Sequence, residues 1–321
     1  MPEYCLKANC NTVHLGGFSD RIPPALTADD GDRIHVETYS GFYLSDRAPD
    51  EFFTPEFREI CDRLPPERKA GPGPHLLTGP IYINGAEPGD ILEIELEEIT
   101  PRLPIGFNAI RAGWGALPEK FADSALRFIS LDLEHNTASL PGHPQLKIPL
   151  HPFFGILGVA SPSEARSSVP PGSFGGNMDN RDLQVGSRIF LPVLVPGALF
   201  SIGDGHAAQG HGEVNGTAIE TSMNGTIRLR LHKQFSLKPP IAKTPSHLIT
   251  MGFAATLDGA LQQALERAVE ALSSQTELTS EEAYVLCSIA VNFQITQVVN
   301  SPQKGVHGLV PLSLFPEGFQ L

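Results

Sequence analysis

A turn that leads into an alternating strand recurs in this chain of 321 residues and restricts the folds that it can adopt. In each copy, a glycine at the turn is followed by residues of alternating polarity, which is typical of a strand with one buried face. The copies are DGDRIHVE at residues 30–37, PGDILEIEL at 88–96 and, more loosely, PGALFSIGD at 196–204. Two explanations stay open: related β units that face one another, or one turn type that unrelated strands reuse.

The composition favours the same class of fold. The chain contains 31 Gly and 29 Pro, and so many turn residues favour many short strands over a helical bundle. Apolar residues make up 41% and charged residues 18%, which argues against disorder. The formal net charge of −13 makes nucleic acid and anionic membranes poor partners.

Cysteine use and hydropathy indicate the compartment. The four cysteines (Cys5, Cys10, Cys61 and Cys287) are too few for a disulfide framework in a chain of this length, and no two form a CxxC pair. The sequence has no apolar run of about 18 residues, and it does not start with a basic-then-apolar segment. We therefore expect a cytoplasmic protein without a membrane span.

A change of pattern near residue 250 predicts helices. Thr256 is expected to cap a helix whose apolar residues recur at i, i+3 and i+4. Thr279 and Glu282 form a capping box that opens a second helix over 280–297, which is apolar on most sides and is expected to be buried. The sequence therefore predicts an α+β fold in a single domain, with a β-rich body of sandwich- or barrel-like strand units (1–250), a helical portion (251–300) and a C-terminal tail (301–321).

The stretch Gly203–Glu213 (GDGHAAQGHGE) concentrates polar residues among glycines and alanines. It is either a loop that binds a metal or a polar substrate, or a solvated glycine-rich hairpin, and the density of ligand-type residues favours the loop. Asp204 and His206 are two positions apart, so their side chains project to one face of an extended segment, as two ligands of one ion require. Asn177 and Asp179 repeat this spacing after a double glycine.

Metal-assisted catalysis is the chemistry that these residues favour. Glu213 ends this stretch and Glu220 follows it. A carboxylate beside metal-activated water can act as its general base. Covalent catalysis has no good candidate, because the sequence contains no G-x-S-x-G elbow and no Walker P-loop. Cys287 lies in an apolar helical pattern, so we expect an inert core thiol there.

Several specific segments follow one another along the chain. The most specific covers residues 175–220, with GGNMDNRDL followed by VPGALFSIGDGHAAQGHGEVNGTAIE. The others are Pro23-Pro24 before Asp32-Arg33-Ile34, HLLTGPIY at 75–82 before GAEPGD at 85–90, Phe107-Asn108, Trp114-Gly115, and QVVN at 297–300 before GVHG at 305–308. With these segments in this order, the chain resembles the acetamidase/formamidase family nearly from end to end.

The resemblance implies a β-rich homo-oligomeric hydrolase that cleaves the C–N bond of small neutral amides, of the formamide and acetamide type, to a carboxylate and ammonia. It also implies a divalent metal, with zinc favoured. Carried over by position, Asp179, Asp204 and His206 become metal ligands, and Glu213 and Glu220 become acid/base residues or further ligands. The expected substrate-binding residues are His75, Asn108, Gln209 and His211.

The chain departs from the family pattern at three positions. His211 stands where the family's HAAQGDGE run has Asp, and Asn292 and Asn300 stand where carboxylates are common in the late segment ending QVVD. Fewer carboxylates near a divalent site lower its charge and its affinity, whereas His211 as a ligand would favour zinc. Two alternatives therefore stay open: a hydrolase with a shifted substrate, such as a lactam or carbamate, and a catalytically silent binding protein on the same fold.

Overall fold

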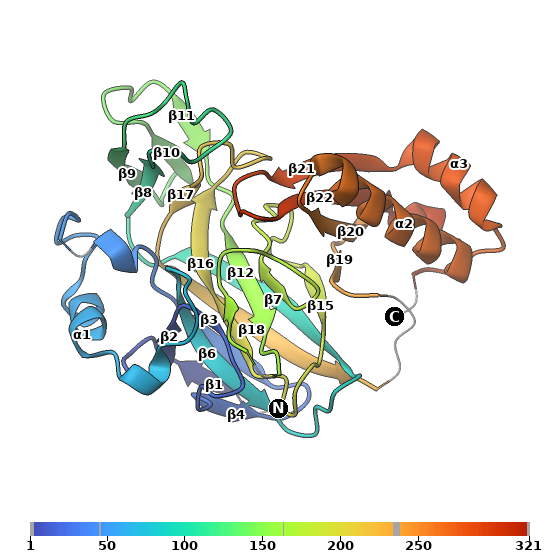
Figure 1. The fold of residues 1–321 in the computed structure, drawn as a ribbon, viewed down its shortest axis with the longest axis horizontal. Helices are drawn as coiled ribbons and strands as arrows, with labels where there is room; N and C mark the ends of the chain where they lie inside the picture. Colours follow the sequence, from blue (N-terminus) through green and yellow to red (C-terminus); the bar gives the residue numbers. More distant parts are fainter. Residues whose placement is uncertain (1–2, 45, 163, 234–237, 320–321) are drawn as a thin grey trace.

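The computed structural model describes all residues except 1–2, 45, 163, 234–237 and 320–321. Within this described part, most strands belong to two large sheets (Figure 1). In order across the first sheet, the strands are β1 (Glu3–Leu6), β5 (Arg33–Glu37), β18 (Met223–His232), β7 (Ile91–Pro101), β15 (Arg188–Pro192), β19 (Ile241–Lys243), β20 (His247–Ala254), β22 (Lys304–Pro311) and β21 (Asn292–Gln297).

The second sheet contains the strand that carries the candidate ligands. Its strands run in the order β11 (Lys147–Pro149), β10 (Thr137–Ser139), β9 (Ala125–Asp132), β8 (Ile105–Ile110), β17 (Ile219–Glu220), β16 (Phe200–Ala208), β12 (Phe153–Val159) and β14 (Gly175–Asn177). Near one end, β6 (Leu76–Ile83) also pairs with β16, and β2 (Val13–Leu15) and β4 (Leu26–Ala28) pair with β6. The short strands β3 (Gly17–Phe18) and β13 (Arg166–Ser167) pair with each other.

The two large sheets share the main hydrophobic core. Alternating side chains of the first sheet meet alternating side chains of the second in one buried cluster, which includes Ile34, Ile94, Leu229, Ile81, Leu157 and Ile202. This arrangement confirms the predicted β-rich, sandwich-like body. On the other face of the first sheet, Glu93, Glu95 and Glu97 of β7 form ion pairs with Arg228, Arg230 and His232 of β18.

The first two copies of the turn-strand unit build the same local structure. In both, the backbone N–H three residues before the strand-side aspartate donates to its carboxylate, from Asp29 to Asp32 and from Glu87 to Asp90, each at 2.8 Å. Their strands, β5 and β7, lie on either side of β18. The third copy differs, because Ala198 takes the place of the aspartate and the following strand, β16, belongs to the other sheet.

The C-terminal helical pair is confirmed, but the second helix ends earlier than predicted. Helix α2 (Leu257–Gln275) is capped by Thr256, and α3 (Ser280–Ala290) starts with the predicted capping box. The prediction of helix up to residue 297 is wrong, since Asn292–Gln297 is strand β21, paired with β22. A helical periodicity and a strand alternation both place apolar residues there, and pairing with a later strand decides the outcome.

Helix α3 is also less buried than the sequence predicts. Ala283 and Cys287 are buried, while Tyr284, Val285 and Ile289 are 59%, 54% and 76% exposed. Figure 1 shows α2 and α3 beside β20–β22, on the opposite side of the strand-rich body from α1 (Pro55–Arg63). None of the helices in the described ranges has both the length and the apolar run that crossing a membrane requires.

Candidate functional site

Strand β16 carries Asp204 and His206 into the interior of the protein. The stretch Gly203–Glu213 was expected to be a loop or a solvated hairpin, but its first part, up to Ala208, is a fully buried strand. Its glycines are required by packing: a Cβ at Gly205 would lie 2.6 Å from the carbonyl oxygen of Thr221. The small residues therefore admit neighbouring strands and leave the polar side chains as the groups that line the site.

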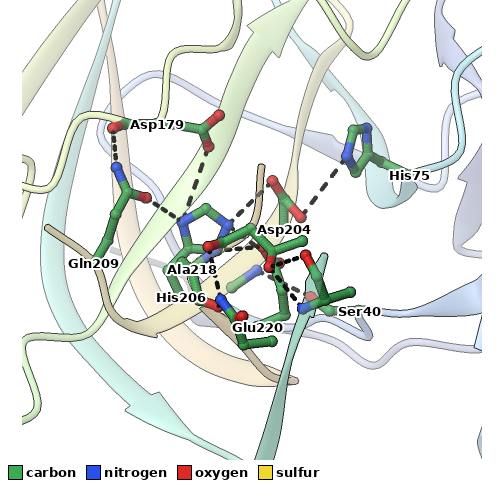
Figure 2. Close-up of polar contacts among 12 residues, drawn as sticks. Ser40, His75, Asp179, Asp204, His206, Gln209, Ala218 and Glu220 are labelled. Atoms are coloured by element: carbon green, nitrogen blue, oxygen red, sulfur yellow. Dashed lines mark hydrogen bonds and ion pairs between the residues drawn. The ribbon is translucent and has the colours of Figure 1, made fainter. Parts of the chain in front are cut away.

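His206 lies at the centre of a ring of carboxylates (Figure 2). Its Nε2 atom is 3.4 Å from Asp204 Oδ2 and 3.2 Å from Glu220 Oε2, and its Nδ1 atom is 3.9 Å from Asp179 Oδ1. The His206 imidazole is 0% exposed and meets the Phe153 ring edge-on. Glu213 lies close enough to form a second ligand-type group with His206 and Glu220.

Gln209 fixes the orientation of the His206 imidazole. Its carboxamide oxygen is 2.8 Å from His206 Nδ1, and its nitrogen donates to the backbone oxygen of Asp179 at 2.8 Å. With the amide in this orientation, Nδ1 carries the proton that is donated to Gln209. The Nε2 atom then faces two carboxylates, so either a second proton or a cation must lie between them.

The backbone is strained at three of the residues that supply these carboxylates. Asp179, Asp204 and Glu213 have φ values of 46°, 57° and 47°, in the left-handed region that costs a residue with a Cβ of the order of 1 kcal/mol or more. Such strain persists only where surrounding structure fixes the residue, and it is frequent at functional sites. Its occurrence at three members of one cluster makes this cluster the candidate functional site.

Burial and mutual interaction shift the pKa values of the groups in this cluster. Burial raises the pKa of Asp179 to about 7 and raises the pKa values of Glu213 and Glu220. Burial acts to lower the pKa of His206, but the charges of Glu220 and Asp204 outweigh it and the pKa rises. For Asp204, burial is outweighed by His75 and His206, which hold its pKa below the ordinary range.

The residues of this cluster fit a divalent cation. Asp179 Oδ1, His206 Nε2 and Glu213 Oε2 are buried, and none of them has a hydrogen-bond partner among the residues that the structure describes. Gly155 leaves room among them, since a Cβ there would lie 2.5 Å from Asp179 Oδ1 and 2.9 Å from Asp204 Oδ2. Two ligands of a tetrahedral zinc ion lie about 3.3 Å apart, close to the separations of His206 Nε2 from Asp204 and Glu220.

A cavity of about 330 Å³ opens onto this cluster. Asp204, Glu213 and Glu220 line it, while Asp179 and His206 lie behind them. The other lining side chains are Tyr39, Ser40, Tyr43, Pro72, Pro74, His75, Leu76, Arg111, Trp114, Val169, Asn177, Thr217 and Asn300. A space of this size with polar groups at one part of its wall suits a small molecule.

The expected substrate-binding residues have different locations. His75 lines the cavity, with Nε2 4.0 Å from Asp204 Oδ1, whereas Gln209 supports His206 from behind. Asn108 does not line this cavity, since its side chain donates to the backbone oxygens of Thr217 and Ala218 and so holds the segment before Glu220. His211 lies outside the cavity as well, 3.7 Å from Asp182.

Much of the cavity wall was not predicted from the sequence. Arg111 donates to the hydroxyl of Tyr43 at 2.6 Å and lies over the rings of Tyr43 and Trp114. Trp114, the single tryptophan of the chain, was part of a similar segment but was not assigned to the site. Asn300, seen only as a departure from the family pattern, lines the cavity and donates to Asp179.

Comparisons with known proteins agree on one family. A sequence profile described as the Acetamidase/Formamidase family matches residues 72–166 and 161–317. A Schizosaccharomyces pombe protein, provisionally assigned as a formamidase, is 27% identical over 288 residues, covering 71% of this chain and 66% of that protein. An acetamidase of Mycolicibacterium smegmatis is 30% identical over 199 residues, covering 44% and 49%.

Solved structures extend the match to the whole chain. The crystal structure of an acetamidase from Bacillus halodurans has a TM-score of 0.84 and 30% sequence identity, and the match covers 99% of this chain and 100% of that one. The chain thus spans two thirds or less of the two curated relatives named above, but the full length of this solved structure.

The space at Gly155 predicts a test of cation binding. A Gly155→Ala variant places a methyl group among Asp179, Asp204 and His206, so we expect its affinity for divalent metal to fall about tenfold or more. Elemental analysis after dialysis against limiting zinc measures this loss. Gly210→Ala is the matched control, because a Cβ at Gly210 meets nothing within 4 Å; equal metal content in the two variants would contradict the assignment.

Proposed function

The chain belongs to the Acetamidase/Formamidase family, and from its site we propose that it hydrolyses the C–N bond of short linear amides to a carboxylate and ammonia. The observation that carries the proposal is the buried cluster of Asp179, Asp204, His206, Glu213 and Glu220 beneath a cavity of about 330 Å³. Carboxylates with perturbed pKa values beside a small cavity can transfer protons to a small substrate bound there.

Asn177 is proposed to orient the substrate. Asn177 lines the cavity, and its side-chain oxygen is buried without a hydrogen-bond partner in the described part of the chain. A neutral amide brings N–H groups that would satisfy this oxygen, whereas an ester or a carboxylate would leave it unpaired. Tyr39 and Trp114 supply apolar surface for a short aliphatic chain.

Glu213 and Glu220 are proposed to move the protons. Among the described residues, Glu213 Oε2 has no hydrogen-bond partner, so Glu213 is the better placed to take a proton from the attacking water and pass it to the departing amine. Glu220 is held more firmly, because its Oε1 accepts the Ala218 N–H at 3.1 Å and its Oε2 lies beside His206. We therefore assign Glu220 as a ligand that also assists proton transfer.

Asp179, Asp204 and His206 are proposed to hold a divalent ion, with zinc as the favoured metal. When bound, this ion supplies a Lewis acid that polarises the amide carbonyl and makes water easier to deprotonate. Gln209 fixes His206 Nδ1 and so would leave Nε2 free to hold the ion, and Asn300 holds the Asp179 carboxylate by a hydrogen bond.

We also propose that the protein is a cytoplasmic homo-oligomer. The exposed Tyr284, Val285 and Ile289 of α3 support contact with another copy of the chain. All four cysteines are free, which supports a reducing compartment. Light scattering of the purified protein gives its mass in solution.

An ammonia-release assay tests the proposed activity. The purified protein is expected to release ammonia from formamide and acetamide, and to lose this activity after exhaustive chelation and regain it with zinc. A lactam and a carbamate in the same panel identify a shifted substrate. Full activity after complete metal removal would contradict the role of the metal. No turnover of any substrate in the panel would contradict the proposed hydrolase activity.

Substitutions within the cluster test the assigned residues. Asp204→Asn and His206→Ala are each expected to lower kcat/KM at least about 100-fold, because each removes a ligand and a charge next to the reacting groups. Asp123→Asn and His143→Ala, at exposed positions, are the matched controls and should keep wild-type activity. A large fall in melting temperature without a change in metal content would show instead that Asp204 and His206 are structural.

The silent-binding alternative rests on the departures from the family pattern. Of these, Asn300 lines the cavity, whereas His211 lies outside it and Asn292 is exposed at the start of β21. We therefore expect the wild-type protein to be active and His211→Asp to change its kcat/KM by less than about tenfold. If His211→Asp instead creates amidase activity that the wild type lacks, the silent-binding alternative is correct.

A further inference from the structure

A second cluster of ligand-type side chains lies outside the cavity. Asp182 follows β14, His211 lies in the loop after β16, and His307 belongs to β22. His307 Nε2 is 2.9 Å and His211 Nε2 is 3.7 Å from the same atom, Asp182 Oδ2, and the two imidazole rings have centroids 5.4 Å apart. Three chain segments thus bring one carboxylate and two imidazoles to a single point.

The spacing and chemistry of these atoms fit a transition-metal ion. Two ligands of a tetrahedral zinc ion are about 3.3 Å apart, between the two separations from Asp182 Oδ2. Two imidazoles and one carboxylate favour zinc and its neighbours over magnesium or calcium, which prefer oxygen. His211 remains partly accessible, with 32% of its side chain exposed, so an ion can enter from solvent.

The surroundings of His307 match those of a metal-bound histidine. Its ring is 0% exposed, and its Nδ1 atom is 2.7 Å from Thr296 Oγ1. A hydrogen bond at one ring nitrogen orients the other toward an ion, as in many metal sites. The charge of Arg181 acts on both Asp182 and His211, and it opposes the binding of a cation.

An ion at this point would join the loop that carries Glu213 to the C-terminal strands. The loop already makes backbone contacts there, since the Gly212 N–H donates to Thr296 at 3.0 Å and the Val298 N–H donates to Gly212 at 3.1 Å. His211 and Glu213 flank Gly212 on either side. A bond from His211 to an ion shared with His307 would restrict the loop next to Glu213.

We propose that Asp182, His211 and His307 form a second, structural divalent-metal site, which favours zinc and its transition-metal neighbours over magnesium or calcium and anchors the loop of Glu213 to β22. This site is separate from the cluster around His206 and does not depend on the proposed amidase activity. It gives His211 a specific role, because an imidazole at this position makes the set of two imidazoles and one carboxylate that zinc prefers.

Zinc titration of the metal-free protein tests the proposal. Zinc bound per chain is measured by elemental analysis and calorimetry for the wild type, His211→Ala, Asp204→Asn and the exposed control His143→Ala. We expect His211→Ala to bind one equivalent fewer than the wild type and His143→Ala to bind the same number. We also expect Asp204→Asn to keep the site of His211. Asp182→Asn, which preserves the shape of its side chain, should repeat the loss seen for His211→Ala.

Hydrogen exchange supplies a readout that is independent of catalysis. Zinc is expected to slow amide exchange at residues 209–216 about tenfold in the wild type and in Asp204→Asn, but not in His211→Ala. If His211→Ala and the wild type bind equal zinc and show equal exchange, the Asp182–His307 contact is a simple hydrogen bond and the proposal is wrong. If Asp204→Asn binds as much zinc as the wild type while His211→Ala binds less, the second site is correct and the proposed metal site at His206 is wrong.

Discussion

Negative charge is concentrated around His206 beyond what the neighbouring side chains neutralise. The carboxyl groups of Asp179, Asp204, Glu213 and Glu220 are all at least nine-tenths buried, and burying unpaired charge is expensive. Burial raises the pKa values of Asp179, Glu213 and Glu220, and the charges of Glu220 and Asp204 raise that of His206 against the effect of its burial. A bound divalent ion would neutralise the same charges, which supports the proposed metal site.

The second sheet is built so that these charges can come together. Gly205 lets β16 lie close against Thr221, and Gly155 on β12 leaves the space in which the oxygens of Asp179 and Asp204 approach each other. Asp179, Asp204 and Glu213 have left-handed backbone, and their carboxylates belong to the groups around His206. Strain, close strand approach and buried charge all act against stability, and their coincidence at one place is typical of a site kept for chemistry.

Local signals in the sequence predicted the elements that local interactions determine. The caps at Thr256 and Thr279 mark real helix starts, because a cap depends on residues within one turn. The end of α3 was not predictable in this way, since β21 exists through its pairing with β22. At the site, the spacing of Asp204 and His206 was visible, but the cavity wall around Arg111 was not, because distant segments assemble it. The position of His211 likewise needed the structure, which separates it from the cavity and brings it to His307.

Anomalous diffraction from crystals of the zinc-loaded protein tests the central claim most directly. We expect an anomalous peak at the zinc absorption edge within bonding distance of Asp204 and His206, with the Asp179 carboxylate turned toward it. A well-ordered cluster without such a peak, in crystals whose protein binds zinc elsewhere or not at all, would contradict the account.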